Sequence, residues 1–428
     1  MAPDAIARLG AELDGPIVLI SATNGKTTTA AMVAAALRAA GRPPIHNKAG
    51  SNMNRGIATA LLEQRTAAPG GGGLFEVDEA WLRPVAAELV PDLIVLANLF
   101  RDQLDRYGEL ERLVDDWAKM LETRVQRGGD WSLVLNADDP LVSDLGRDAD
   151  GAPRPGVVYF GVDDPSVSLA EPQHAHDAKH CRRCGAPYQY ERFYMGHLGH
   201  YRCPDCDSAR PRPSVAARRV ELLGFDGSRV EVDSPAGPIN FTLPLPGLYN
   251  VYNAVAASAA LLQLGLGPAA IATSLEATAA VFGRVEEIQI EGRRVAILLI
   301  KNPIGASEVL RTLAQPAQPL ELWIALNDKI ADGRDISWVW DADFEPPAEL
   351  ILRVTCSGSR APEMANRLKY AGWDPARIVV DDDLHGSFNR AVAAVEPGGR
   401  LFALPTYTAL LELRTRLADR GLAKEYWA

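Results

Sequence analysis

One stretch decides the fold of the first part of the chain: Pro16-Ile-Val-Leu-Ile-Ser-Ala-Thr-Asn-Gly-Lys-Thr-Thr-Thr29. Residues 16–22 are typical of a buried strand, and the Ala-rich residues 27–40, closed by Gly41, predict a helix. The Gly-Lys-Thr sequence between them lies where an α/β unit places a phosphate-binding loop. The alternative is a Gly-Lys-Thr sequence that occurs at a helix start by chance, which would require the order of strand, loop and helix around it to be accidental as well. The predicted nucleotide-binding residues are Thr23, Asn24, Gly25, Lys26, Thr27 and Thr28, with the Thr27 hydroxyl as a Mg²⁺ ligand.

Strand and helix candidates alternate along the rest of the chain, which predicts an α/β protein. Apolar strands are expected at residues 74–77, 92–99, 132–136, 294–300, 320–326, 350–355, 377–380 and 401–404, and helices at 110–123 and 250–264. A second series of alternating strand and helix candidates begins around residue 284. We therefore expect an ATP-binding domain at 1–285 and a parallel, doubly wound, Rossmann-like domain at 286–428. Residues 165–213 are rich in His, Cys, Arg and Pro, and we interpret them as an inserted module.

Composition and charge exclude several classes of protein. The chain has 428 residues, 47% of them hydrophobic, and a net charge of −11. We see no apolar run of 18 residues and no signal peptide, so we expect a cytoplasmic globular protein. A pI near 5.3 argues against a general nucleic-acid binder, which needs clustered Lys and Arg.

Four of the five cysteines form two Cys-x-x-Cys pairs inside the inserted module. Cys181 and Cys184 are separated by 18 residues from Cys203 and Cys206, the spacing of a zinc ribbon. A site of four thiolates leaves no open position for water, so we predict a structural Zn²⁺ rather than a catalytic one. Three nearby histidines are surplus to such a site and are interpreted as surface residues: His180, His197 and His200.

The phosphate-binding loop departs from the strict Walker pattern, because Ile20 stands where that pattern has its first glycine. It resembles the Thr-Asn-Gly-Lys-Thr-Thr loop of the Mur ligase superfamily, ATP-dependent enzymes that form amide bonds on peptidoglycan precursors. Further segments that resemble the superfamily begin at Asn98 (Asn-Leu-Phe-Arg-Asp-Gln-Leu-Asp), Asn136 (Asn-Ala-Asp-Asp), Gly247, Gly283 (Gly-Arg-Val-Glu) and Lys301 (Lys-Asn-Pro). The resemblance implies a Mur ligase-type ATPase domain followed by a C-terminal α/β domain.

The same resemblance assigns roles to individual residues. Glu76 matches the magnesium glutamate of the superfamily, although Asp78 and Glu79 are rivals and a solvated strand end is the alternative. Asn250 and Asn253 lie on one helical face and suit the adenine, unless Asn250 only caps the helix. Arg284 is a candidate contact for phosphate.

Three departures separate this chain from the classical Mur ligases. The chain begins about fifteen residues before the nucleotide strand, so we expect no domain for a UDP moiety and no UDP-linked substrate. The metal-binding His of the superfamily is Gln103 here, and its carbamylated Lys falls at Trp117, near Lys119, which predicts a weakened second metal site. Lys301 replaces the His of His-Asn-Pro and Leu298 the preceding acidic residue, so recognition of an incoming amino acid has changed.

A second signature follows the predicted strand 320–326: Asn327-Asp-Lys-Ile-Ala-Asp-Gly-Arg-Asp335-Ile-Ser-Trp-Val-Trp340. It occupies the edge where open α/β sheets bind ligands. The alternative is a helix capped by Asp335, with Trp338 and Trp340 in the core. Together with the zinc ribbon, this segment resembles the MurT family, the synthetase subunits of lipid II isoglutaminyl synthase.

That resemblance implies ATP-dependent amidation of the α-carboxylate of D-glutamate in a lipid II or lipid I stem peptide, at the inner face of the membrane. Ammonia would come from a separate GatD-like glutaminase, because Cys356 lies in no recognisable nucleophile motif and reads as a buried strand-end thiol. Asp335 would either position ammonia or orient the catalytic His of the partner. Two alternatives stay open: a ligase that adds a whole amino acid, and a zinc-ribbon regulatory ATPase that binds nucleic acid.

Overall fold

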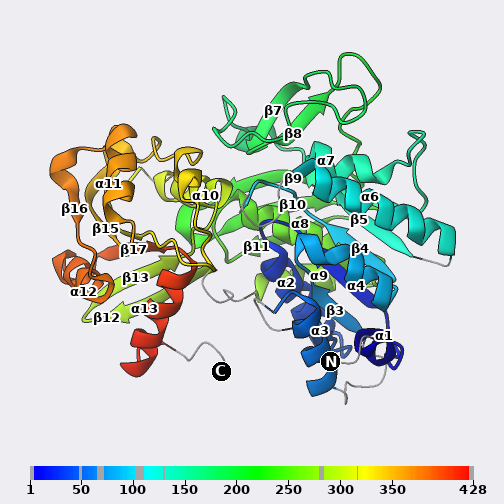
Figure 1. Ribbon diagram of the computed structural model, residues 1–428, viewed down its shortest axis with the longest axis horizontal. Helices are drawn as coiled ribbons and strands as arrows, with labels where there is room; N and C mark the ends of the chain where they lie inside the picture. Colours follow the sequence, from blue (N-terminus) through cyan, green and yellow to red (C-terminus); the bar gives the residue numbers. More distant parts are fainter. Residues whose placement is uncertain are drawn as a thin grey trace. The chain divides into compact units, whose positions relative to one another are not determined.

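The computed structural model describes residues 4–47, 51–64, 72–102, 110–128, 131–278, 284–315 and 317–423. These residues form two compact units (Figure 1). The first unit is built from the chain up to residue 279. The second is built from the chain after that residue, together with Asp102 and residues 173–175.

The first unit is organised around a nine-stranded sheet with the order β11-β10-β9-β6-β5-β4-β1-β3-β2. Its strands are β1 (Ile17–Ser21), β2 (Ile45–His46), β3 (Gly73–Glu76), β4 (Leu93–Leu96), β5 (Ser132–Asn136), β6 (Val157–Val162), β9 (Val215–Leu222), β10 (Ser228–Asp233) and β11 (Ile239–Leu243). The strands from β2 to β9 are parallel, and β10 and β11 extend the sheet antiparallel. Buried parallel strands are covered on both faces, which explains why they read as unbroken apolar runs in the sequence.

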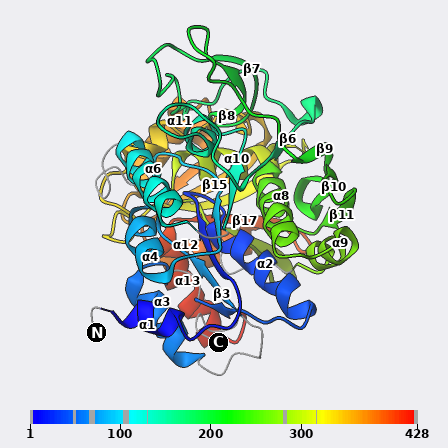
Figure 2. The same cartoon turned by 90° about the vertical axis from the view of Figure 1, so that its right-hand side faces the viewer.

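Helices cover both faces of this sheet, as Figure 2 shows. One layer contains α1 (Ala5–Gly10), α3 (Asn54–Glu63), α4 (Leu82–Leu89) and α6 (Leu110–Arg127), whose apolar residues share one core with β1 and β4. The other contains α2 (Lys26–Ala39), α8 (Leu248–Gln263) and α9 (Pro268–Glu276), which pack on one another. The helix α2 begins directly after the loop that follows β1, as the sequence predicts.

The predicted insertion lies between β6 and β9, which pair with each other in the sheet. It contains a hairpin of β7 (Gln189–Met195) and β8 (Leu198–Arg202), drawn in green in Figure 1. The short helix α7 (Pro140–Ser143), which follows β5, contacts β8 through a hydrogen bond between the hydroxyls of Ser143 and Tyr201.

The second unit has a six-stranded sheet with the order β12-β13-β17-β14-β15-β16. Its strands are β12 (Arg284–Ile290), β13 (Arg293–Leu298), β14 (Leu320–Ala325), β15 (Ile351–Ser357), β16 (Ile378–Val380) and β17 (Arg400–Pro405). Its helices are α10 (Pro303–Ala314), α11 (Ala361–Tyr370), α12 (Leu384–Ala394) and α13 (Tyr407–Asp419). The five strands that the sequence predicts in this unit pair in parallel, as expected. The strand β12, which was not predicted, pairs antiparallel with β13 at one edge.

The structure also answers the question of membrane-spanning segments. Among the residues described above, no helix combines the length and the apolar character that crossing a bilayer requires.

Candidate functional site

The loop between β1 and α2 has the backbone that phosphate binding requires. Gly25 precedes the first residue of α2 and has a φ of 89°, a left-handed conformation that glycine adopts without strain. A Cβ atom at this position would lie 1.9 Å from Oδ1 of Asn253, so the space next to the loop also demands glycine. The N–H groups at the start of α2 remain available for an anion, as at other helix N-termini.

Lys26 is buried beside a group of carboxylates. Its Nζ donates to the carbonyl oxygen of Ala22 at 2.9 Å and to Oε2 of Glu79 at 3.1 Å. Burial lowers the pKa of Lys26, but three nearby carboxylates outweigh burial, and the pKa is raised overall. These carboxylates belong to Glu79, Asp78 and Glu76. The sequence indicated all three as metal candidates but gave no sign that Glu79 pairs with the lysine.

The three carboxylates differ in their local surroundings. Glu76 ends β3, is 1% exposed, and both its backbone N–H and carbonyl are held by the amide of Asn47. The side chain of Asp78 accepts a hydrogen bond from the N–H of Ala80 and caps a short 3₁₀ helix. Carboxylate oxygens are ligands that suit Mg²⁺, which also binds the phosphates of a nucleotide. The assignment of Glu76 and Thr27 as its ligands stays a prediction.

Asn250 and Asn253 lie on α8, and the structure places them at the phosphate loop. Oδ1 of Asn253 accepts a hydrogen bond from the Thr29 hydroxyl at 3.4 Å, and its Nδ2 donates to Oδ1 of Asn250 at 3.1 Å. Asn250 does not cap α8, because the N-cap residue is Gly247; its Nδ2 donates to the carbonyl of Pro246. Their role in binding the adenine stays a prediction.

Residues 98–100, after β4, are tied to the same loop. The amide of Asn98 accepts from the N–H of Asn24 and donates to its carbonyl, both at 2.9 Å. The Thr23 hydroxyl accepts from the N–H of Phe100 at 3.1 Å. The carboxylate of Asp139 accepts from the N–H of Leu99 at 2.9 Å. The Asn-x-x-x-Asp and Asn-Ala-Asp-Asp segments therefore hold the phosphate loop in place.

The positions of the second metal site of the superfamily lack metal ligands where the structure describes them. Trp117 is 1% exposed and donates its indole N–H to the carbonyl of Glu79, and Lys119 is exposed on α6. Gln103 lies outside the described residues, and so does the side chain of Arg284, the predicted phosphate contact.

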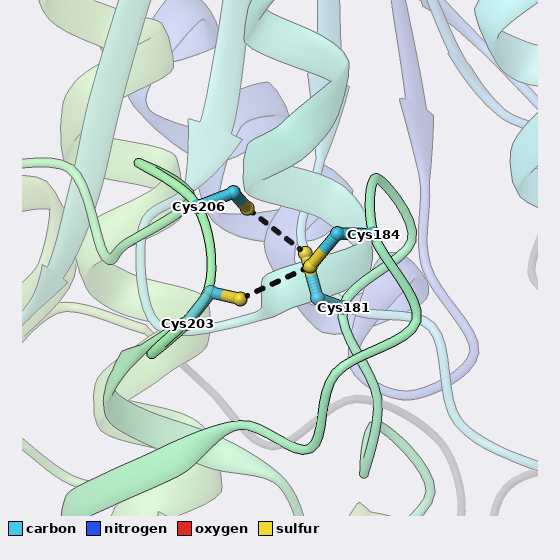
Figure 3. Close-up of side chains that lie close together, drawn as sticks. All are labelled: Cys181, Cys184, Cys203 and Cys206. Atoms are coloured by element: carbon cyan, nitrogen blue, oxygen red, sulfur yellow. Dashed lines mark hydrogen bonds between the residues drawn. The ribbon is translucent and has the colours of Figure 1, made fainter.

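The four cysteines of the inserted module come together, as Figure 3 shows. The sulfurs of Cys181 and Cys206 are 3.6 Å apart, those of Cys184 and Cys203 3.3 Å, and all four lie within 4.8 Å of one another. A tetrahedral Zn²⁺ with Zn–S bonds of about 2.3 Å holds its sulfurs about 3.8 Å apart. The two loops that carry the cysteines therefore have the geometry that a structural zinc site requires.

The prediction that the three histidines of the module are surface residues was wrong for His197. His180 is exposed and His200 is half-buried, but His197 is 0% exposed and its ring lies 4.7 Å from that of Phe100. A local signal was present but not used: the turn is flanked by the apolar and aromatic residues Tyr194, Met195 and Leu198, all of which are buried.

Several basic residues of the module and of the adjoining strand are held in ion pairs within the protein. Arg182 and Arg183 pair with Asp144, and Arg210 and Arg218, the latter on β9, pair with Asp163. Cations that are held in internal ion pairs form a poor surface for a phosphate backbone.

The Asp-Gly-Arg-Asp segment of the second unit follows β14, as predicted. The carboxylate of Asp335 is exposed and accepts a hydrogen bond from the N–H of Ser337 at 2.8 Å, which lowers its pKa. The capping alternative was wrong: the short 3₁₀ helix Ser337–Trp340 has Ile336 as its N-cap residue, Trp340 is 48% exposed and Trp338 is half-buried. Asp335 thus presents an ionised carboxylate to solvent.

Two further predictions concern this unit. Lys301 donates to Oδ2 of Asp102 at 2.7 Å, and Asn302 caps α10 through Gly305. Cys356 is buried at the end of β15, and burial raises the pKa of its thiol to about 12, so this thiol is not an activated nucleophile.

Comparison with known families agrees with this geometry. The Mur ligase middle domain model matches residues 20–201, and the model described as MurT ligase C-terminal matches residues 299–410. Among solved structures, a pseudomurein peptide ligase type C from Methanothermus fervidus is similar with a TM-score of 0.72 at 22% identity, over 96% of this chain and 80% of that one. MurF from Acinetobacter baumannii is similar with a TM-score of 0.68 at 16% identity, over 97% and 78%. The Mur ligase fold is thereby confirmed.

Curated relatives resemble the chain along nearly all its length. The protein named lipid II isoglutaminyl synthase (glutamine-hydrolyzing) subunit MurT from Streptococcus pneumoniae is 32% identical over 96% of this chain and 88% of its own. The protein of the same name from Staphylococcus aureus is 32% identical over 97% and 90%. A phosphate loop of the Mur type, the four clustered cysteines and the matched C-terminal domain occur here in one chain, and we conclude that it belongs to the MurT family of Mur ligase-type proteins.

Proposed function

We propose that this chain is the ATP-dependent synthetase subunit of a lipid II isoglutaminyl synthase. It would convert the α-carboxylate of D-glutamate in a lipid-linked stem peptide to the amide. The observation that carries the proposal is the buried Lys26 beside three carboxylates at a Mur-type phosphate loop, in a chain related over nearly its whole length to proteins of that name.

The chemistry has two steps whose atoms balance. The substrate carboxylate attacks the terminal phosphorus of ATP, which forms an acyl phosphate and releases ADP. Ammonia then attacks the acyl carbon, phosphate leaves, and the nitrogen loses a proton. Mg²⁺ supplies charge neutralisation at the phosphates when it is bound. Lys26 and the N–H groups at the start of α2 stabilise charge on the transferred phosphoryl group.

Lys26 must exchange partners for this role. Its ammonium group contacts Glu79 and the Ala22 carbonyl. A phosphate at the loop would offer the ammonium a stronger charge partner, and Glu79 would then be able to hold Mg²⁺. We infer that Glu79 keeps the lysine charged and oriented before ATP binds.

Ammonia reaches the site from a partner of the glutaminase class. The buried, protonated thiol of Cys356 leaves the described part of the chain without an activated cysteine nucleophile, because the other four cysteines form the zinc site. Asp335, exposed and ionised, suits the second of its two predicted roles, which is to orient the catalytic histidine of the partner. The substrate head group would be met at the inner face of the cell membrane.

A test against the nucleic-acid alternative measures ATP hydrolysis by the purified heterodimer with three stimulants: a lipid-linked muropeptide, RNA and DNA. The proposal predicts stimulation by the muropeptide alone, and loss of that stimulation in Lys26→Met. Stimulation by RNA or DNA would favour the regulatory ATPase and contradict the proposal. The internal ion pairs of Arg182, Arg183, Arg210 and Arg218 support the first outcome.

A further inference from the structure

The turn of the zinc-ribbon hairpin is buried, although the cysteine end is partly exposed. Residues 196 and 197 connect β7 to β8, and the cysteines lie at the opposite end of these strands. His197 and Leu198 are 0% exposed, whereas Cys184 is exposed. The turn of the hairpin is therefore buried in the ATPase core, while of the four clustered cysteines Cys184 is exposed, Cys206 half-buried and the other two buried.

His197 occupies its position without the contacts that usually keep a histidine buried. Within the described part of the chain, neither ring nitrogen makes a hydrogen bond. Nε2 lies 3.3 Å from Oδ1 of Asp139, close enough for an electrostatic contact. An apolar side chain of similar volume would satisfy the fold at least as well, because burying unsatisfied polar groups costs stability. A role beyond packing accounts better for an imidazole at this position.

The contacts of His197 lead directly to the phosphate loop. Its ring packs on Phe100, whose backbone N–H donates to the Thr23 hydroxyl. Its partner Asp139 accepts a hydrogen bond from the N–H of Leu99 through Oδ2 and caps α7 through Oδ1. Residues 98–100 thus lie between the hairpin turn on one side and Thr23 and Asn24 on the other.

We propose that His197 is a positioning residue for the phosphate-binding loop, and that it couples the zinc ribbon to ATP binding. The metal-ordered ribbon keeps the imidazole in contact with Phe100 and Asp139. These contacts keep residues 98–100 in the position from which they hydrogen-bond to the phosphate-binding loop. Small displacements of such a loop are costly, because phosphate contacts depend on geometry to within about 1 Å. The inference rests on the proposed ATP site at residues 21–29.

Coupling of this kind is reciprocal. If a docked ribbon strengthens ATP binding, then bound ATP must stabilise the docked, metal-loaded ribbon by the same factor. Zinc should therefore bind more tightly to the ATP-bound chain than to the ATP-free chain, and a chelator should remove less of it at equilibrium. A purely structural histidine would not produce this dependence.

The test uses the full zinc-loaded chain, with His197→Leu and His197→Gln compared to His200→Leu. His200 lies on the same hairpin and contacts the carbonyl of Val162 and Asp163 instead of residues 98–100, which makes it a matched control. The dissociation constant of a fluorescent ATP analogue with Mg²⁺ is measured, together with zinc content and thermal midpoint. Release of zinc to a chelator is followed with and without ATP.

We expect His197→Leu to weaken nucleotide binding about ten-fold, His197→Gln to weaken it less because its amide can make a polar contact with the carboxylate of Asp139 that leucine cannot, and His200→Leu to leave it unchanged. ATP should reduce the fraction of zinc lost to the chelator at equilibrium in the wild type and in His200→Leu but not in His197→Leu. Wild-type nucleotide affinity in His197→Leu, or an equal loss in both histidine positions, overturns the inference. A wild-type chain that binds no nucleotide would instead overturn the proposed function.

Discussion

At the scale of single residues, Gly25 shows how backbone and neighbours act together. Its φ of 89° and the proximity of Asn253 both oppose a side chain at this position. Gly41, at the other end of the same helix, has a φ of 73°, but a Cβ atom there would meet no other atom within 4 Å. A comparison of substitutions at Gly25 and Gly41 therefore distinguishes the cost of backbone strain alone from the cost of strain combined with a steric clash.

Gly25→Ala should lower the free energy of unfolding by about 3 kcal/mol, because it adds a clash to the strain. Gly41→Ala should lower it by about 1 kcal/mol, from strain alone. Denaturant titration measures both, and binding of a fluorescent ATP analogue should be lost only in Gly25→Ala. Equal destabilisation of the two variants would show that Asn253 does not restrict the loop.

Asp335 tests the division of labour between the subunits. In Asp335→Asn the charge is removed, while the amide oxygen can still accept from Ser337. If the carboxylate orients the histidine of the partner, amidation from glutamine should fall at least about 100-fold, as for other triad carboxylates, and amidation from free ammonium should persist. Both rates are measured on the heterodimer by product mass.

Asp374→Asn is the matched control for this change, because Asp374 is an exposed residue that accepts a hydrogen bond from Ala376 in the same local pattern. It should leave both rates unchanged. Loss of the ammonium-driven rate in Asp335→Asn would assign the carboxylate to ammonia instead.

Residue roles that depend on local pattern were predictable, and roles that depend on distant partners were not. The phosphate loop and the four cysteines are defined by spacing within a few residues. The ring of His197 packs on Phe100, a residue 97 positions away in the sequence. Lys26 pairs with Glu79, which lies 53 positions away, after the neighbouring strand β3. Contacts of this kind follow from the topology of the sheet and leave no signal in the neighbouring sequence.

At the scale of elements, most apolar parallel strands were predicted because strands buried on both faces read as apolar runs, but β6 was missed. The edge strand β12 was also missed, because four of its seven residues are polar or charged and interrupt any apolar run. The inserted module was found from its composition, while its hairpin was not; beside the hairpin, Cys181, Ala186 and Cys203 form a small cluster with Tyr188 and Cys206.

Metal removal should therefore act on this element first. In Cys203→Ser, we expect zinc content to fall from one per chain to near zero, because three thiolates and a hydroxyl bind Zn²⁺ far more weakly. Hydrogen exchange in β7 and β8 should rise while β1 and β4 stay protected. Cys356→Ser, in a cysteine outside the cluster, should keep its zinc. A full zinc complement in Cys203→Ser would contradict the assignment of the site.

At the scale of the whole molecule, an ATPase of the Mur ligase type and a C-terminal domain of the MurT type occur together in one chain. The phosphate loop supplies activation of a carboxylate, and no described cysteine is left to release ammonia from glutamine. Activity with glutamine should therefore appear only when the chain is combined with a glutaminase subunit.

The most direct measurement follows the mass of the product. The heterodimer is given ATP, Mg²⁺, a lipid-linked muropeptide and glutamine that carries a heavy nitrogen isotope in its side-chain amide. We expect the α-carboxyl hydroxyl of D-glutamate to be replaced by a labelled amino group, only when ATP is present. An unchanged muropeptide, or one that gains a whole amino-acid residue, would contradict the proposed function.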